Sequence, residues 1–179
     1  ATGGIGNFVQ ASLADMVMCQ VRRELGIPSF TGLGGQAVAR RFNQDAVWEI
    51  STNMMQAFYS RPATCDYLGS IDEGITFSLH SLLLCNDLAG LLRSLWQGVA
   101  VDDNSMALNE ARAVGPRGNY LALDHTASHC REQLWNTRYF GPRIPTRMSS
   151  LPDQDLLERI DADLRGVLAE HRVEDLPAT

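Results

Sequence analysis

Lysine is absent from the 179-residue chain, and all 15 of its basic residues are arginines. This absence excludes a Schiff-base lysine and a P-loop lysine from this stretch. Long apolar runs are also absent: the run at residues 82–85 is followed at once by Asn86 and Asp87, whereas a membrane-spanning helix needs about 18 apolar residues. No basic stripe is visible, and the net charge is -6. We therefore expect neither a membrane protein nor a nucleic-acid partner.

The cysteines are few and widely spaced. They are Cys19, Cys65, Cys85 and Cys130, with no C-x-x-C pair among them, and three of the four lie in apolar or helical segments. This pattern is typical of buried free thiols in a reducing compartment and predicts a cytoplasmic protein.

Hydrophobic periodicity predicts a helix-rich α/β chain. Helices are expected over residues 7–25, 44–59 and 79–99, from 102 or 103 to 114, in a short segment through 134, and in a terminal segment opened by Pro152. Short strands are expected over 27–31, 64–69 and 120–123. Strands that alternate with helices indicate βαβ units and a parallel sheet. Three short strands fit the C-terminal portion of a TIM (β/α)8 barrel, with residues 1–179 as a single unit, better than a whole barrel.

The glycine-rich opening, residues 1–6, is typical of a loop that enters a helix and not of a signal peptide. We therefore expect the chain to be the C-terminal part of a larger enzyme. A half-barrel would leave sheet edges and apolar helix faces uncovered, which favours a homo-oligomer or association with the missing N-terminal half.

Residues that could carry chemistry gather near the expected strand ends, where barrel active sites are built. Aromatic side chains there are usually part of the core, but they could instead face a cation. The acidic residues Asp15 and Asp87 interrupt apolar helices, where paired or solvated carboxylates are the commoner case. Residues 32–35 form a glycine-rich loop, which we interpret as a tight connection more readily than as a phosphate site.

His125 and His129 are four residues apart and precede Cys130, a spacing that could hold zinc. No second His, Cys or carboxylate cluster accompanies them. We therefore favour a pocket-facing His125 and a locally packed His129, and predict no metal.

Several segments together resemble the C-terminal part of the trimethylamine methyltransferase family. They are residues 26–28 with 34–35, residues 44–49, the run Asp72-Glu73-Gly74-Ile75-Thr76-Phe77-Ser78, residues 84–87, residues 114–121, and His125-Thr126 followed by Arg131 and Trp135. The chain departs from the family pattern at Asp87, where glutamate is expected, and at residues 43–45, which replace an Asp-x-Gln.

The resemblance implies a TIM barrel that moves a methyl group from a quaternary or tertiary methylamine to the cobalamin (corrinoid) cobalt of a separate corrinoid protein. The chain itself would bind no cofactor directly. Every residue is a standard amino acid, which favours the non-pyrrolysine, glycine betaine methyltransferase-like branch if the pyrrolysine position falls in this stretch.

We expect a substrate pocket that holds an ammonium group with aromatic faces and carboxylates. The residues predicted to form it are Phe30, Tyr67, Asp72, Asp87 and His125; the catalytic residues are unknown. The alternative is a non-catalytic chain of the same fold that binds an amine or completes a partner subunit.

Overall fold

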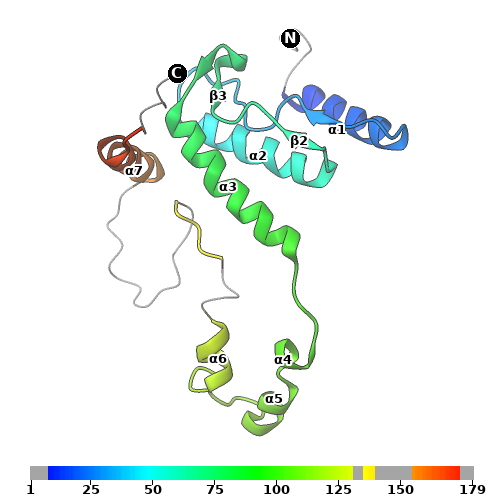
Figure 1. The fold of residues 1–179 in the computed structure, drawn as a ribbon, viewed down its shortest axis with the longest axis vertical. Coiled ribbons are helices and arrows are strands. Elements are labelled where there is room, and N and C mark those ends of the chain that lie inside the picture. The colour runs from blue at the N-terminus through cyan, green and yellow to red at the C-terminus, as the bar shows by residue number, and fades with distance from the viewer. Residues whose placement is uncertain (1–7, 131–134, 140–154, 174–179) are drawn as a thin grey trace, which may run out of the picture.

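The computed structural model describes residues 8–130, 135–139 and 155–173. The helices are α1 (Phe8–Glu24), α2 (Gln44–Ser60), α3 (Leu79–Gln97), α4 (Asp103–Met106), α5 (Leu108–Val114), α6 (Asp124–His129) and α7 (Leu156–Glu170), with a 3-10 turn, η1 (Asp72–Gly74). The strands are β1 (Phe30–Thr31), β2 (Thr64–Cys65), β3 (Ser70–Ile71) and β4 (Thr76–Phe77). Figure 1 shows α1 and α2 near β2, and α4 to α6 at the opposite end of the molecule.

One βαβ unit organises the part of the chain that precedes α3. Strands β1 and β2 are parallel, with Phe30 opposite Thr64 and Thr31 opposite Cys65. Parallel neighbours need a crossover, and α2 supplies it. The first two predicted strands and their parallel pairing are confirmed, although each strand is only two residues long.

The third predicted strand, at residues 120–123, is wrong. These residues form a turn in which the Leu121 N–H donates to Asn119 Oδ1 and the Leu123 N–H donates to the Tyr120 carbonyl. Leu121 is 84% exposed, so no neighbouring strand covers it. The local Asn119 bond offers the backbone an alternative to a sheet ladder.

An antiparallel hairpin occupies residues 70–77, where the sequence analysis predicts no strand. Ser70 pairs with Phe77 and Ile71 pairs with Thr76. The described residues therefore hold one parallel pair and one antiparallel pair rather than three parallel strands.

The helix predictions hold for the three long segments up to residue 97 and need correction further on. The single helix expected up to Val114 is two helices, because Ala107 adopts a left-handed conformation (φ 46°) between α4 and α5. The short helix ends at His129, and residues 131–134 lie outside the described part. The terminal helix begins at Leu156 with Asp155 as its N-cap, and Pro152 also lies outside it.

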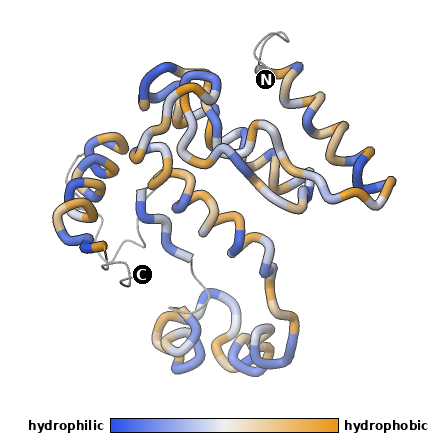
Figure 2. The backbone as a smooth tube through the Cα atoms, turned by 45° about the horizontal axis from the view of Figure 1, so that its top comes forward, coloured by the Kyte–Doolittle hydropathy of each residue, from blue (hydrophilic) through white to orange (hydrophobic). Residues whose placement is uncertain are grey.

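The core forms where α2, α3 and α7 pack together. Its fully buried side chains include Ala46, Ile50, Leu84, Cys85 and Ile160. Figure 2 shows hydrophilic and hydrophobic residues alternating along α7, as expected of a helix with one buried face.

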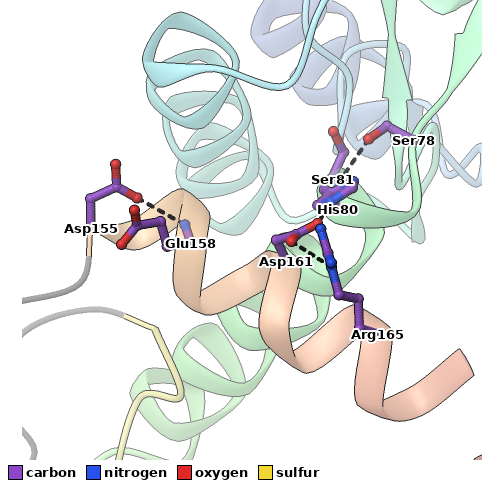
Figure 3. A network of polar contacts seen from close by, with 7 residues as sticks. All are labelled: Ser78, His80, Ser81, Asp155, Glu158, Asp161 and Arg165. Atoms are coloured by element: carbon purple, nitrogen blue, oxygen red, sulfur yellow. Dashed lines mark hydrogen bonds and ion pairs between the residues drawn. The ribbon is translucent and has the colours of Figure 1, made fainter. Parts of the chain in front are cut away.

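A polar contact fastens α7 to the start of α3 beside this core. Asp161 Oδ1 lies 3.1 Å from His80 Nε2, and its Oδ2 accepts a 2.8 Å hydrogen bond from Arg165 Nε (Figure 3). Hydrogen bonding to His80 lowers the pKa of the Asp161 carboxyl, and the charge of Arg165 lowers it further. Asp161 therefore joins two helices that lie 81 residues apart in the sequence.

All four cysteines are free thiols, but only Cys19 and Cys85 are buried; Cys65 and Cys130 are exposed. The prediction of buried thiols is thus half correct. Within the described ranges, no helix is both long enough and apolar enough to span a bilayer.

Candidate functional site

A pocket of about 400 Å³ opens at the carboxyl ends of β1 and β2, beside α1. Its lining includes residues from α1, from the segments that follow both strands, and from η1: Ala11, Ala14, Asp15, Met18, Arg22, Phe30, Gly32, Leu33, Gln36, Tyr67 and Glu73. Ligands in parallel α/β folds bind at this end of the strands. The volume suits a small molecule.

The pocket places two carboxylates and two aromatic rings around one space. Asp15 comes from α1 and Glu73 from η1, while Phe30 lies in β1 and Tyr67 follows β2. Carboxylates neutralise an ammonium ion, and aromatic faces attract it through their quadrupoles. The arrangement is therefore suited to a small organic cation.

Asp15 is held in place by the backbone. Its Oδ1 accepts a 2.9 Å hydrogen bond from the Gly32 N–H, which joins α1 to the loop after β1. Its Oδ2 is buried and has no hydrogen-bond partner among the residues that the structure describes. Burial raises the pKa of the Asp15 carboxyl, while the Gly32 bond and the charge of Arg22 offset part of that rise.

The two aromatic rings differ in what they already contact. The guanidinium of Arg22 lies over the Phe30 ring, with Cζ 5.1 Å from its centroid. Tyr67 has no such neighbour among the described cation–π pairs, and it adopts a left-handed backbone conformation (φ 56°). The Tyr67 ring is therefore the aromatic surface that remains available to a bound cation.

Asp72 lies next to the pocket but does not line it. Both Asp72 (φ 52°) and Glu73 (φ 54°) are left-handed, so the chain turns sharply through η1. Asp72 Oδ1 lies 3.6 Å from Nε of the exposed Arg40, and Glu73 is the acidic residue of this turn that reaches the pocket.

Asp87 has a different environment. It is 7% exposed on α3 and accepts hydrogen bonds from the Thr137 hydroxyl (2.7 Å), the Arg138 N–H (2.8 Å) and the Tyr139 N–H (3.3 Å). These bonds fix residues 137–139 against α3. Asp87 also lines a separate cavity of about 710 Å³ with Trp135 and Arg93.

His125 lies on α6, at the far end of the molecule from β1 (Figure 1). Its ring stacks on that of His129, with centroids 4.2 Å apart, and its Nε2 lies 2.7 Å from the Asn104 carbonyl. Within the described residues, no group of three His, Cys, Asp or Glu side chains is arranged to hold a metal ion. The structure thus brings together Phe30 and Tyr67 of the predicted set, leaves Asp72 beside them, and separates Asp87 and His125 from them.

The glycine-rich loop allows two backbone segments to approach closely. The Gly35 N–H donates to the Asp66 carbonyl at 3.0 Å. A Cβ at Gly35 would lie 2.8 Å from both Leu68 Cα and Cys85 Sγ. The glycines therefore serve the packing of the loop after β1 against the loop after β2, in line with the prediction of a tight connection.

Sequence reasoning missed Arg22 and Gln36, and it judged Asp15 to be paired or solvated. These residues lie on one face of a helix and in a loop, and no sequence motif links their positions. Only the tertiary fold brings them together. Asp15 carried one usable sign, since it is the one acidic residue of α1 apart from the terminal Glu24.

The described residues form a helix-rich fold with a few short strands, and a pocket lined by carboxylates and aromatic rings lies at the ends of β1 and β2. Residues 3–178 match the family described as trimethylamine methyltransferase (MTTB), and the chain belongs to this family. The suggested family resemblance is thereby confirmed.

Similar proteins include trimethylamine methyltransferase MttB of Desulfitobacterium hafniense (strain DSM 10664 / DCB-2), 34% identical over 109 residues that cover 61% of this chain and 22% of the relative. MttB of Methanosarcina barkeri is 24% identical over 173 residues, which cover 94% of this chain and 34% of the relative. Glycine betaine methyltransferase of Desulfitobacterium hafniense (strain Y51) is 24% identical over 129 residues, which cover 72% of this chain and 26% of the relative. The chain therefore spans about a third or less of the length of these relatives.

Proposed function

We propose that the chain forms part of a methyltransferase that takes a methyl group from a quaternary or tertiary methylamine and passes it to a corrinoid protein. Family membership supports the methyltransferase activity. The names of the relatives support a methylated amine as substrate, with trimethylamine and glycine betaine as the two candidates.

The observation that carries the proposal is the composition of the pocket at the ends of β1 and β2. Asp15, Glu73 and the Tyr67 ring surround a space of small-molecule size. A methylated ammonium ion is small, cationic and weakly hydrated, so it gains from aromatic faces and buried carboxylates. The pocket would bind this group and restrict the access of water.

The chemistry needs little from the protein in the way of proton transfer. The corrinoid of the partner would supply the nucleophile that accepts the methyl group, and a quaternary amine would leave as a neutral tertiary amine. The residues of this chain would hold the ammonium group and orient one methyl group toward the open side of the pocket.

We propose further that β1, α2 and β2 belong to a TIM barrel. The parallel pair with its helical crossover supports this, as does a pocket at the carboxyl ends of the strands. We also propose a cytoplasmic location, which is supported by four free thiols and no disulfide within the described residues.

The full protein tests the proposal when it is mixed with cob(I)alamin and either trimethylamine or glycine betaine. We expect one of the two amines to give a methylated corrinoid product, and the absorbance of the corrinoid measures its formation. Tyr67→Leu should weaken amine binding by about 2- to 30-fold, corresponding to about 0.5–2 kcal/mol for a cation–π contact, while Tyr67→Phe should retain it. No transfer with either amine, in the presence of measurable binding, would contradict the proposed reaction.

A second candidate is a non-catalytic chain that binds an amine or completes a partner subunit. The observation that favours it is the exposure of large apolar side chains on the hairpin and on α3, such as Ile75, Phe77 and Trp96. Binding without methyl transfer, or activity that appears only when a partner chain is added, would support it.

A further inference from the structure

Carboxylates that bind a cation can be distinguished by whether their oxygens already have partners. Asp87 accepts three hydrogen bonds, and Asp72 forms an ion pair with Arg40. One oxygen of Asp15 accepts a hydrogen bond from the Gly32 N–H, and the second is buried with no partner in the described part of the chain. A buried charged oxygen without a partner is unfavourable unless a ligand supplies one.

Gln36 adds a neutral polar side chain to the lining of the pocket. Its side chain is 6% exposed and lines the pocket, and no hydrogen bond of its amide occurs within the described residues. Its backbone groups are both engaged: the Gln36 N–H donates to the Leu33 carbonyl at 3.1 Å, and the Gln36 carbonyl accepts from Asn53 Nδ2 at 2.9 Å. The Gln36 amide is therefore a polar group of the pocket lining that can donate to or accept from a polar ligand.

The charges that face Asp15 leave its carboxylate without full compensation. Arg22 also lines the pocket, and its guanidinium lies over the Phe30 ring, while its charge offsets only part of the rise in the pKa of Asp15. Asp66, after β2, also has a buried oxygen without a partner within the described ranges. Burial raises the pKa of the Asp66 carboxyl, and the charge of Asp15 adds to that rise. Glu73 adds a further negative charge at the exposed rim of the pocket. A bound cation would relieve the repulsion among these groups.

We propose that Asp15 is the counter-ion of the ammonium group bound in this pocket, and that the Gly32 N–H positions it for this role. The inference rests on the proposed function, because it assumes that the pocket receives a methylated amine. It assigns the charge-neutralising role to a residue of α1 in place of Asp72 or Asp87. The hydrogen bond from the Gly32 N–H holds the Asp15 carboxylate at the pocket wall before the ligand arrives, so less ordering is needed on binding.

The experiment is calorimetric titration of the full protein with tetramethylammonium chloride. Asp15→Asn is the informative variant, since an asparagine Oδ1 can still accept from the Gly32 N–H while the charge is removed. We expect the affinity for tetramethylammonium to fall by at least about tenfold, because removing one partner of a desolvated charge pair costs much of its binding free energy. Glu24→Gln is the matched control: it removes one charge from the exposed end of the same helix, and its affinity should match that of the wild type.

A second measurement does not depend on the folding of a variant. The affinity of the wild-type protein for tetramethylammonium should fall as the pH is lowered through the raised pKa of Asp15, because the protonated carboxyl carries no charge. Folded Asp15→Asn should show a flatter profile.

The outcomes separate the two proposals. Wild-type protein that fails to bind tetramethylammonium would overturn the cation pocket itself, and with it both proposals. Wild-type protein that binds, with equal affinity in Asp15→Asn and no pH dependence, would overturn only the role of Asp15.

Discussion

The carboxylate of Asp15 accepts a 2.9 Å hydrogen bond from the backbone N–H of Gly32, 17 residues further along the chain. This bond connects α1 with the loop after β1 at the edge of the candidate pocket. It satisfies one carboxylate oxygen, while the other is buried and has no partner in residues 8–130, 135–139 and 155–173. The same geometry that suits Asp15 to bind a cation should therefore make it unfavourable for stability when the pocket is empty.

Asp15→Asn should raise the melting temperature of the ligand-free protein near pH 7. Burial raises the pKa of Asp15 in the folded state, so the ionised carboxylate opposes folding at pH values above that raised pKa. Below the unfolded value of about 3.9 the carboxyl is protonated in both states, and the difference between variant and wild type should disappear. Thermal melts from pH 7 to pH 3 check the sign. A lower melting temperature at pH 7 would show that the charge stabilises the fold.

Asp87→Ala should lower the free energy of unfolding by about 3 kcal/mol, because hydrogen bonds to a buried charged group are strong and three donors would lose their acceptor. Asp87→Asn keeps one acceptor oxygen and should lose less. Denaturant titration gives both values. Binding of tetramethylammonium by the folded protein should not change. If Asp87→Asn instead weakened binding without lowering stability, Asp87 would bind the substrate, as the sequence analysis expects.

The fold was predictable from the sequence where the apolar periodicity extends over several helical turns. Helices α1, α2 and α3 extend over four to five turns each, so their apolar periodicity is clear. The hairpin of β3 and β4 has two residues in each strand, too few to show alternation. The break at Ala107 depends on a left-handed backbone that alanine rarely adopts, so no sequence rule predicts it.

The candidate site was only partly predictable for a different reason. Phe30 and Tyr67 follow the general rule that ligands bind at the ends of parallel strands, and the rule placed them correctly beside one pocket. Asp15 and Arg22 reach the same pocket from a helix that precedes β1, which depends on how α1 packs against the sheet. His125 was expected at the end of a strand over residues 120–123. That strand does not form, so nothing places His125 beside the other predicted residues.

Gly35→Ala should destabilise the protein by about 1–3 kcal/mol, because the added Cβ would lie 2.8 Å from Leu68 Cα and from Cys85 Sγ in a tightly packed loop. Gly166→Ala is the matched control. Gly166 lies inside α7 with nothing within 4 Å of an added Cβ, so alanine should stabilise that helix by about 0.5–1 kcal/mol. Opposite signs in denaturant titration are the expected result. Equal and small effects would mean that the Gly35 loop can move away from Leu68.

Asp161→Asn should weaken the attachment of α7 to α3 near neutral pH. The bond to His80 and the charge of Arg165 lower the pKa of Asp161 in the folded state, so its contribution to stability is present above the unfolded value of about 3.9. That contribution is lost as the pH falls through the lowered folded value, and the variant should then resemble the wild type. Hydrogen exchange of the α7 amides at pH 6, with thermal melts at pH 6 and pH 3, measures the difference.

The control for this prediction is Glu170→Gln, which removes one negative charge from the exposed end of the same helix without breaking a contact described in the structure. Its α7 amides should exchange as in the wild type. Because α7 contributes Ile160 and Leu164 to the core, faster exchange in Asp161→Asn should reach the residues around these two side chains. Exchange that increases equally in both variants would mean that net charge, and not the contact between His80 and Asp161, holds α7 against α3.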